Sequence, residues 1–497
     1  MAILAGIDVG TTRTKGVIIE DDGTILAEAT TPDTDIPKYG AGPISEQEPD
    51  DWVNAAKQNL ATLVKKSGKN PDAIGISGQM HGLVALDNMG RVVRKAIIWD
   101  DRRTDEESAY IRQKTGKDVG HFTVAKLLWV KRHEPEVFGK IDKVMLPEDY
   151  VAYQLTGERT TTPQGLSQMR LWNFEKGCLD EAVLDALEIP KSLIPEIRGD
   201  TGLHGKITHK IQHETGLLEG TPVHAKAGDQ QSAAIANGAV TRGDSYVNSG
   251  TSGIIGIITQ DMKDKSGRGI YWMKHLNHTA INLACTLSCG ASYKWLRDNV
   301  FADVKDKMGA VDPEFVYPVI NLFVGRAPAG SGGVIWLPYL KGERSPRDDS
   351  TIRAGFVGIG EKTPRVHLAR AVLEGVAHSF RHCQQVLAQQ GNTFKKVRAS
   401  HSGLLSETSP FIYILADDLQ VPIEFVNNPG GCFGVALAAG VGAEVYHSLE
   451  TACTRTIRPT SVIQPRQENR DAMTRSYDMF VEVGDRLSEI FRKYAEK

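Results

Sequence analysis

The chain has 497 residues, of which 41% are hydrophobic and 24% are charged. This length predicts two domains of roughly 250 residues each, since single hydrophobic cores rarely grow larger than that. The net charge of -3 offers no basic surface for nucleic acid or anionic membrane, and no window holds the roughly 18 apolar residues of a membrane span.

The six cysteines are scattered and lack the paired spacing of a zinc site. They are Cys178, Cys285, Cys289, Cys383, Cys432 and Cys453. The N-terminus has neither a basic segment nor a cleavage site for secretion. Together these features predict reduced thiols and a cytoplasmic protein.

The first 70 residues contain three strand patterns and a helix pattern. Apolar runs at 3–9, 15–20 and 24–30 predict strands joined by the tight turns Gly-Thr-Thr and Asp-Asp-Gly. Residues 49–68 alternate apolar and polar positions at helical spacing and end in Gly68, which predicts an amphipathic helix.

Strands are then predicted at 73–78 and 83–87, flanking the loop Gly-Gln-Met-His-Gly, and at 94–99. Helical patterns dominate from 100 to 200. Residues 221–228 predict another strand, followed by a helix at 230–240 rich in small residues.

The second half begins by repeating the first hairpin. Asn248-Ser249-Gly250-Thr251-Ser252 aligns with Asp8-Val9-Gly10-Thr11-Thr12, about half a chain earlier, which indicates two related half-molecules. We therefore place a domain boundary at Gly243, giving domains 1–243 and 244–497. The last helices could pack back on the first domain.

Glycine and threonine in these turns suit phosphate, because glycine lets backbone N–H groups approach a ligand and threonine adds a hydroxyl donor. Asp8 beside the first turn could hold Mg²⁺ through its water shell. The alternative is a plain hairpin in which Asp8 caps its own turn.

Asp229 follows a predicted strand and opens a helix. Aspartate is a good N-cap, so it could simply cap that helix. It could equally be the carboxylate that phosphoryl transfer needs to orient and deprotonate an attacking hydroxyl.

Two loops carry side chains that suit carbohydrate. Gln79 and His81 could read sugar hydroxyls from a flexible loop, although a lone histidine is more often structural. Trp99, Asp100 and Arg102 stand at the end of the strand predicted at 94–99, where a surface salt-bridge cluster is an equally good interpretation. The charged loop at 342–349 receives no role.

These segments together resemble the FGGY family of carbohydrate kinases. Residues 8–16 are similar to its first phosphate motif, 227–240 to its catalytic-aspartate segment and 248–253 to its second phosphate motif. Residues 354–377 fit its C-terminal signature through Glu374. Residues 122–133 fit its N-terminal signature around Lys126 and Trp129, except that His121 stands where other residues are usual.

The resemblance implies an α/β, two-domain, actin-like (ribonuclease H-like) ATPase fold with the active site in the interdomain cleft, and a homodimer. It implies Asp229 as catalytic base, with Asp8 and Asp229 as the carboxylates for Mg²⁺. The expected sugar contacts are Gln79, Met80, His81, Trp99, Asp100, Arg102, Asp229 and Gln230. The expected contacts to ATP are Gly10, Thr11, Thr12, Lys15, Gly250, Thr251, Ser252, Gly403 and Leu404.

The adenosine segment departs from the family pattern. Gly403 is followed by Leu404 and Leu405 instead of further glycine, and Phe411 and Tyr413 replace the usual Trp and Gln. Leucines where backbone should approach the nucleotide predict either a reshaped adenine pocket or a neighbouring turn that takes over.

Within the family, the loops at 78–82, 97–104 and 342–349 look most like those of xylulokinases. The expected activity is therefore ATP-dependent phosphorylation of D-xylulose to D-xylulose 5-phosphate. The alternatives are a kinase for gluconate, ribulose or a polyol, and a non-catalytic actin-fold protein that binds nucleotide as a switch or filament subunit.

Overall fold

The computed structural model describes residues 1–31, 35–267, 269–308 and 316–495. Its first half is built on a six-stranded sheet in the order β13-β14-β5-β1-β2-β3. The strands are β1 (Ile3–Val9), β2 (Thr14–Glu20), β3 (Ile25–Thr31), β5 (Ala73–Gly78), β13 (Leu203–Lys206) and β14 (Pro222–Gly228). The three strands predicted before residue 31 are therefore present.

The second half is built on a seven-stranded sheet in the order β17-β18-β16-β15-β21-β22-β23. The strands are β15 (Ser245–Ser249), β16 (Gly253–Thr259), β17 (Ile270–Lys274), β18 (Ala280–Thr286), β21 (Val397–Ser400), β22 (Ile423–Val426) and β23 (Pro459–Ile463).

Both sheets share one plan. In each, an antiparallel meander (β1-β2-β3 or β15-β16-β18) is extended by two parallel strands (β5-β14 or β21-β22) beside its first strand. A further antiparallel strand then follows (β13 or β23). The repeated hairpin in the sequence is thus the start of a repeated fold.

The remaining elements surround and connect these sheets. The first-half helices are α1 (Pro49–Ser67), α2 (Asp105–Thr115), α3 (Thr123–His133), α4 (Pro135–Phe138), α5 (Pro147–Thr156), α6 (Pro163–Met169), α7 (Glu181–Ala186), α8 (His209–Thr215) and α9 (Asp229–Ala236). The second-half helices are α10 (Gly290–Trp295), α11 (Ala302–Met308), α12 (Val316–Arg326), α13 (Arg365–Gln389), α14 (Pro410–Leu419), α15 (Gly431–Gly442), α16 (Leu449–Thr456) and α17 (Arg470–Ala495). The short strands are β4 (Glu46–Gln47), β6 (Val84–Leu86), β7 (Ala96–Ile97), β8 (Lys143–Met145), β9 (Thr160–Thr161), β10 (Trp172–Asn173), β11 (Cys178–Leu179), β12 (Glu196–Ile197), β19 (Ile335–Leu337) and β20 (Gly355–Val357).

Helix α1 follows the predicted pattern closely. Its buried face carries Trp52 and Leu60, while Asp50 and Asp51 lie in its first turn, where acidic side chains complement the helix dipole. Gly68 ends it with a left-handed φ of 63°, a conformation that glycine adopts without steric cost.

Two helices cross between the halves. Helix α15 follows β22 of the second sheet yet packs on β1 and β5 of the first. Close approach is possible because Gly6 and Gly75 lack side chains: a Cβ at those positions would lie 1.9 Å from the Cys432 carbonyl oxygen and 2.2 Å from that of Val435. Helix α9 follows β14 of the first sheet and places Ala233 among residues of the second.

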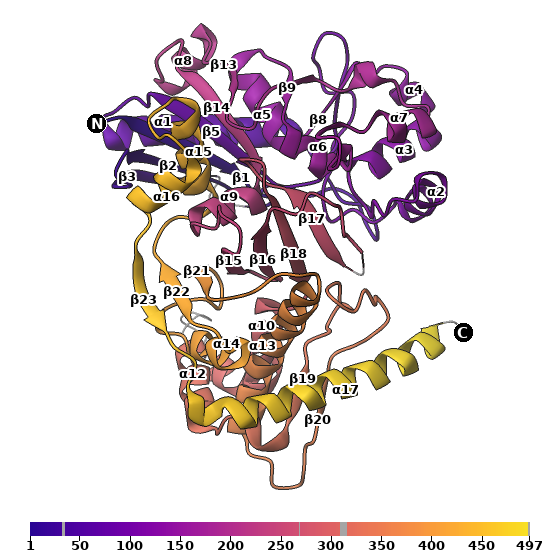
Figure 1. The fold of residues 1–497 in the computed structure, drawn as a ribbon, viewed down its shortest axis with the longest axis vertical. Coiled ribbons are helices and arrows are strands. Elements are labelled where there is room, and N and C mark those ends of the chain that lie inside the picture. The colour runs from indigo at the N-terminus through magenta and orange to yellow at the C-terminus, as the bar shows by residue number, and fades with distance from the viewer. Residues whose placement is uncertain (32–34, 268, 309–315, 496–497) are drawn as a thin grey trace.

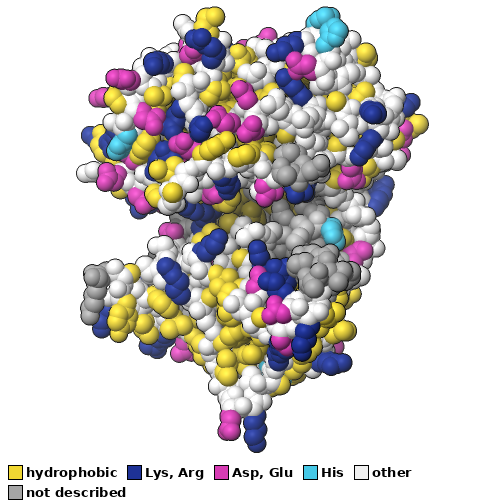
Figure 2. All heavy atoms as spheres, turned by 180° about the vertical axis from the view of Figure 1, so that it is seen from behind, with side chains coloured by type: hydrophobic (Ala, Val, Ile, Leu, Met, Phe, Trp, Pro, Cys, Tyr) yellow, Lys and Arg dark blue, Asp and Glu magenta, His cyan; other side chains and the backbone are white. Residues whose placement is uncertain are grey.

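The two halves form two bodies in Figure 1, and the space-filling view in Figure 2 shows a hollow between them. Helix α17 crosses the second body. It packs there through Tyr477 and Phe480, whereas α15 and α16 join the core of the first. None of the helices in the described ranges has the length and apolarity needed to cross a membrane.

Candidate active site

The two Gly-Thr turns close in similar ways at the ends of corresponding strands. The backbone N–H of Gly10 donates to the carbonyl of Arg13 at 3.1 Å, and that of Gly250 donates to the carbonyl of Ser252 at 2.8 Å. The second turn also accepts from the N-terminus of α10, where the Gly290 N–H lies 3.0 Å from the Gly250 carbonyl.

Asp8 is held at the end of β1 by the neighbouring strand. Its Oδ1 accepts a hydrogen bond from Ser77 Oγ at 2.8 Å, and burial raises the pKa of its carboxyl group. The start of α15 approaches so closely that a Cβ on Gly431 would lie 2.7 Å from Asp8 Oδ2. The carboxylate is therefore positioned by contacts outside its own turn.

Thr11 and Gln79 are bound to each other. Thr11 Oγ1 donates to Gln79 Oε1 at 3.0 Å and accepts from Trp99 Nε1 at 2.9 Å. Gln79 is only 2% exposed, and its amide donates to Gln47 Oε1 at 2.9 Å. Gln79 therefore links the first Gly-Thr turn, through Thr11, to Gln47 at the end of β4. Thr12 and Lys15 are exposed.

Asp229 is the first residue of α9. The N-cap position belongs to Gly228, and no side-chain cap closes this helix. Burial, together with the nearby charge of Asp8, raises the pKa of Asp229 to about 7, although hydrogen bonds involving Gln230 oppose the shift. A carboxyl group with this pKa can accept a proton near neutral pH.

A cavity of about 790 Å³ lies between the two halves and is lined by residues of both. Six of the residues expected to contact a sugar line it: Met80, His81, Trp99, Arg102, Asp229 and Gln230. Of the residues expected to contact ATP, Ser252 also lines it. Asp100 instead forms an ion pair with Lys38, with Nζ and Oδ2 2.6 Å apart.

His81 is held in a strained orientation toward this cavity. Its φ is 62°, a left-handed value that is uncommon outside glycine. Its Nδ1 donates to the Gln168 carbonyl at 3.0 Å, and its ring stacks on Phe122 with centroids 3.6 Å apart. Burial holds the pKa of His81 well below its usual value, so the neutral ring keeps Nε2 as a hydrogen-bond acceptor.

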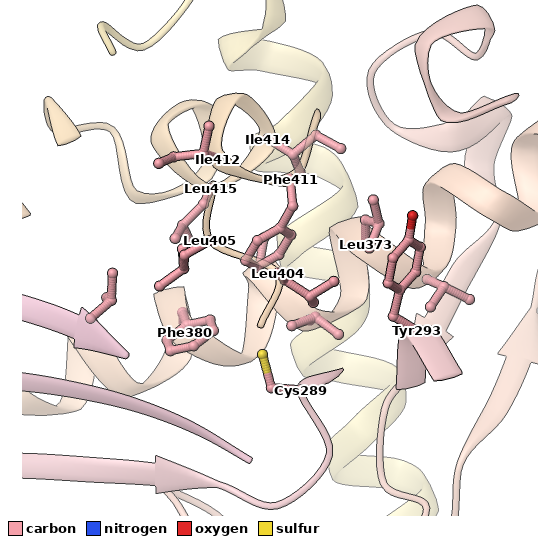
Figure 3. Close-up of a cluster of buried hydrophobic side chains, with 14 of the residues drawn as sticks. Cys289, Tyr293, Leu373, Phe380, Leu404, Leu405, Phe411, Ile412, Ile414 and Leu415 are labelled. Atoms are coloured by element: carbon pink, nitrogen blue, oxygen red, sulfur yellow. The ribbon is translucent and has the colours of Figure 1, made fainter. Parts of the chain in front are cut away.

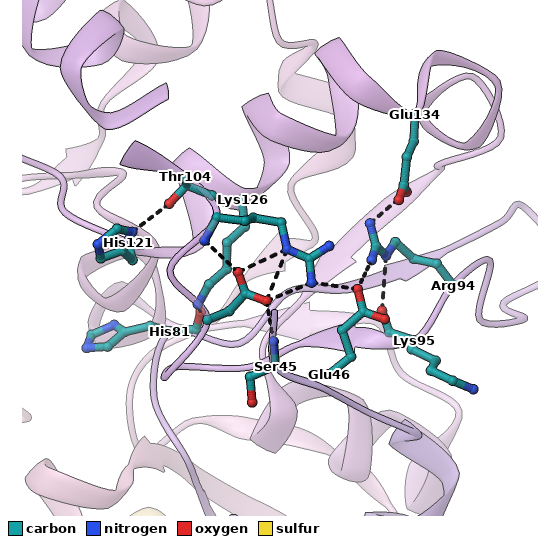
Figure 4. A network of polar contacts seen from close by, with 11 residues as sticks. Ser45, Glu46, His81, Arg94, Lys95, Thr104, His121, Lys126 and Glu134 are labelled. Carbon is teal, nitrogen blue, oxygen red and sulfur yellow. Dashed lines mark hydrogen bonds and ion pairs between the residues drawn. The ribbon is translucent and has the colours of Figure 1, made fainter. Parts of the chain in front are cut away.

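A polar network supports the loop that carries His81 and the loop at 101–104 (Figure 4). Lys126 Nζ donates to the His81 carbonyl at 2.5 Å, and burial lowers the pKa of Lys126 to about 7. Asp101 accepts from the Ser45 N–H at 2.7 Å and from the Arg103 side chain. These contacts give Lys126 of the N-terminal signature a concrete positioning role.

Several cavity residues were not anticipated from the sequence. Phe122 and Tyr271 stack at 5.6 Å and extend the aromatic wall that begins at His81. Glu343 and Arg344 come from the loop at 342–349, for which no role was predicted. Its dense charge was the available signal, but the sequence could not say which of its side chains face the cleft.

The adenosine segment lies against the second hairpin. Gly403 has φ 52°, and a Cβ there would lie 2.2 Å from the Ser249 carbonyl oxygen, so only glycine fits. The Leu404 N–H donates to Ser249 Oγ at 3.2 Å. Figure 3 shows Leu404 and Leu405 among buried side chains that include Phe411. The leucine side chains therefore pack in the domain core, and only backbone remains to meet a ligand.

The residues present fit Mg²⁺ bound with ATP. In the residues that the structure describes, no group of three or more His, Cys, Asp and Glu side chains could enclose a metal ion. Mg²⁺ nevertheless retains several waters and usually takes one or two carboxylates. Asp8 and Asp229 lie close enough for the charge of Asp8 to raise the pKa of Asp229, so the number and proximity of these carboxylates match that requirement.

The N-terminal domain model of the FGGY family of carbohydrate kinases matches residues 3–236, and its C-terminal domain model matches residues 245–443. A xylulose kinase of Bacillus subtilis is 29% identical over 498 residues, covering 97% of this chain and 97% of that protein. The crystal structure of xylulose kinase from Rhodospirillum rubrum superimposes with a TM-score of 0.87 at 27% identity, covering 99% of this chain and 100% of that one.

These likenesses confirm the predicted two-domain actin-like fold and the predicted carbohydrate kinase class. The family models together span most of the sequence, from the first strand to the end of α15. The chain therefore belongs to the FGGY family of carbohydrate kinases.

Proposed function

We propose that this kinase transfers the γ-phosphoryl group of ATP to a primary hydroxyl of D-xylulose. The observation that carries the proposal is Asp229, a carboxyl group with a pKa near 7 on the wall of a cavity that also contains His81. The relatives of B. subtilis and R. rubrum, both named xylulose kinases, support the choice of sugar.

Asp229 accepts the proton of the attacking hydroxyl in this proposal. Burial keeps its carboxylate poorly solvated and raises the pKa of Asp229 to about 7, so the group can accept and release a proton near neutral pH. Met80 supplies an apolar contact from the same wall, and neutral His81 accepts a hydrogen bond from a sugar hydroxyl through Nε2.

The turns at Gly10 and Gly250 face the phosphates with the exposed Thr12 and Thr251, because the N–H groups of both glycines and the Thr11 hydroxyl already have partners within the protein. Asp8, with Asp229 beside it, would hold Mg²⁺, which would supply positive charge near the phosphoryl oxygens. Gly403 brings backbone close to the nucleoside.

The role of the base is tested by Asp229→Asn, which keeps the shape of the side chain. We expect turnover to fall by at least about 10²–10⁴-fold, the usual contribution of a general base, while ATP affinity changes little. Asp185→Asn, on the exposed face of α7, is the matched control and should retain activity. Near-normal turnover in Asp229→Asn would remove that residue from the role.

The substrate is tested by coupled ADP release with D-xylulose, D-ribulose, D-gluconate and xylitol at fixed Mg²⁺ and ATP. D-xylulose should give the highest kcat/KM. A higher value for D-gluconate would overturn the choice of sugar. If no sugar stimulates ATP turnover, the kinase assignment to this cavity fails.

A further inference from the structure

Two arginines meet across the cleft from opposite halves of the molecule. Arg102 follows β7 in the first half, and Arg344 lies in the loop between β19 and β20 in the second. Both line the sugar cavity. The charge of Arg344 is among the factors that lower the pKa of Arg102, so the two guanidinium groups lie close enough to repel.

No carboxylate in the described ranges forms an ion pair with either guanidinium within 4.0 Å. Of the acidic neighbours, Asp100 pairs with Lys38, while Asp105 and Asp348 are exposed to solvent. Arg112 and Arg170, which also line the cavity, are both paired, with Asp118 and Asp264.

Glu343 adds a further donor beside Arg344. Its Oε1 accepts from the Leu287 and Arg344 N–H groups at 2.9 and 2.8 Å. Its Oε2 is buried and has no hydrogen-bond partner among the described residues. Burial raises the pKa of Glu343 to about 8, so at neutral pH the group is largely protonated. In its protonated form Glu343 can itself donate a hydrogen bond through Oε2.

Arg344 lies on the wall of the cavity formed by β18, where its Nη1 is 4.0 Å from Cys285 Sγ. Its charge also contributes to the lowered pKa of His81.

We propose that Arg102 and Arg344 form an anion subsite that spans the cleft and holds the carboxylate of a sugar acid. It would bind the end of the sugar that is remote from the phosphorylated hydroxyl. Planar guanidinium groups match a carboxylate through paired N–H donors. The inference rests on the proposed function in one respect: the sugar must lie in this cavity.

In a neutral ketose the same donors would meet the carbonyl group and its neighbouring hydroxyl. The subsite therefore recognises the oxidised end of the sugar, whether ketone or carboxylate. A bound anion would also remove the repulsion between the two halves and favour closure of the cleft.

The test compares D-xylonate with xylitol, which has the same carbon chain but no charged end, by calorimetry without ATP. The wild-type protein should bind D-xylonate at least tenfold more tightly. Arg102→Gln and Arg344→Gln should each reduce the ratio of the two affinities by about tenfold or more, since a hydrogen bond to a charged group contributes about 1.5–3 kcal/mol. Arg102→Lys should retain part of the ratio.

Arg112→Gln is the matched control, because Arg112 lines the same cavity but is already paired with Asp118 at 2.8 Å. It should leave the ratio unchanged, and circular dichroism should verify that each variant is folded. Equal wild-type affinity for the two ligands, or a ratio that survives both substitutions, would overturn the subsite. Displacement of D-xylonate by inorganic phosphate as readily as by D-gluconate would overturn its assignment to sugar acids. Because no phosphoryl transfer is measured, failure of Asp229 as base would leave these results unaffected.

Discussion

Asp8 and Asp229 come from different strand ends of one sheet and share one region of negative potential. Burial disfavours the ionised form of each carboxyl group, and the charge of Asp8 adds to the effect at Asp229. Two close carboxylates seldom both ionise unless a cation lies nearby. The raised pKa makes Asp229 a proton acceptor near neutral pH, and a divalent cation between the two carboxylates would stabilise their ionised forms.

This pair gives a prediction about pH. The pKa of Asp229 in the free enzyme should be about 7, so lowering the pH through 7 protonates the base and should reduce activity. Carboxyl ¹³C NMR of the metal-free enzyme would measure the titration, and the signal absent in Asp229→Asn identifies it. Mg²⁺ with ATP should move the titration to lower pH, because a bound cation offsets the charge of Asp8. Titration of Asp229 near pH 4 in the free enzyme would contradict this account.

Single residues show where sequence reasoning succeeds and where it stops. The acid-glycine-hydroxyl pattern predicts the turn after Asp8, because its conformation is set by adjacent residues. Gln79 and Asp100 occupy the predicted loops, yet their partners are Gln47 and Lys38. Local sequence does not encode which distant side chain will satisfy a polar group, so neither partner could be named in advance, although a surface salt bridge was one of the two interpretations for Asp100.

Among the elements, α9 and α15 show the same limit. The predicted helix at 230–240 ends at Ala236, followed by Asn237 and by Gly238 at φ 67°. Small residues in both helices were visible in the sequence. That they allow the helices to touch is visible only in the fold, where a Cβ on Gly434 would lie 2.0 Å from the Ser232 carbonyl oxygen.

Gly434→Ala should therefore destabilise the protein by about 1–3 kcal/mol, the range for overpacking a core. Gly325→Ala is the control, since that helical glycine has open space around it and alanine should stabilise the helix by about 0.5–1 kcal/mol. Urea unfolding of both variants measures their free energies of unfolding, which should fall for Gly434→Ala and rise for Gly325→Ala. A stable Gly434→Ala protein would show that the helices can separate without cost.

For the molecule as a whole, the exchange of helices makes the halves interdependent. The apolar face that includes Leu4 and Ala73 is covered by α15, which lies nearly the whole chain length away from β1. Repetition in the sequence predicts two domains of similar plan, but it does not predict that each completes the core of the other. The cavity at their junction consequently draws residues from both halves.

A fragment of residues 1–243 should therefore fail to fold alone, because it would expose the face that α15 covers. Joining residues 427–458 behind it through a flexible linker should restore a cooperative thermal transition, since this segment carries α15 and α16. Joining residues 470–494 of α17 instead should not, because α17 packs on the second half. Near-ultraviolet circular dichroism and calorimetry would report fixed packing in each fragment. If residues 1–243 alone melt cooperatively, the first domain has a sufficient core of its own. In that case α15 acts to align the two halves around the cleft and is not needed for the first domain to fold.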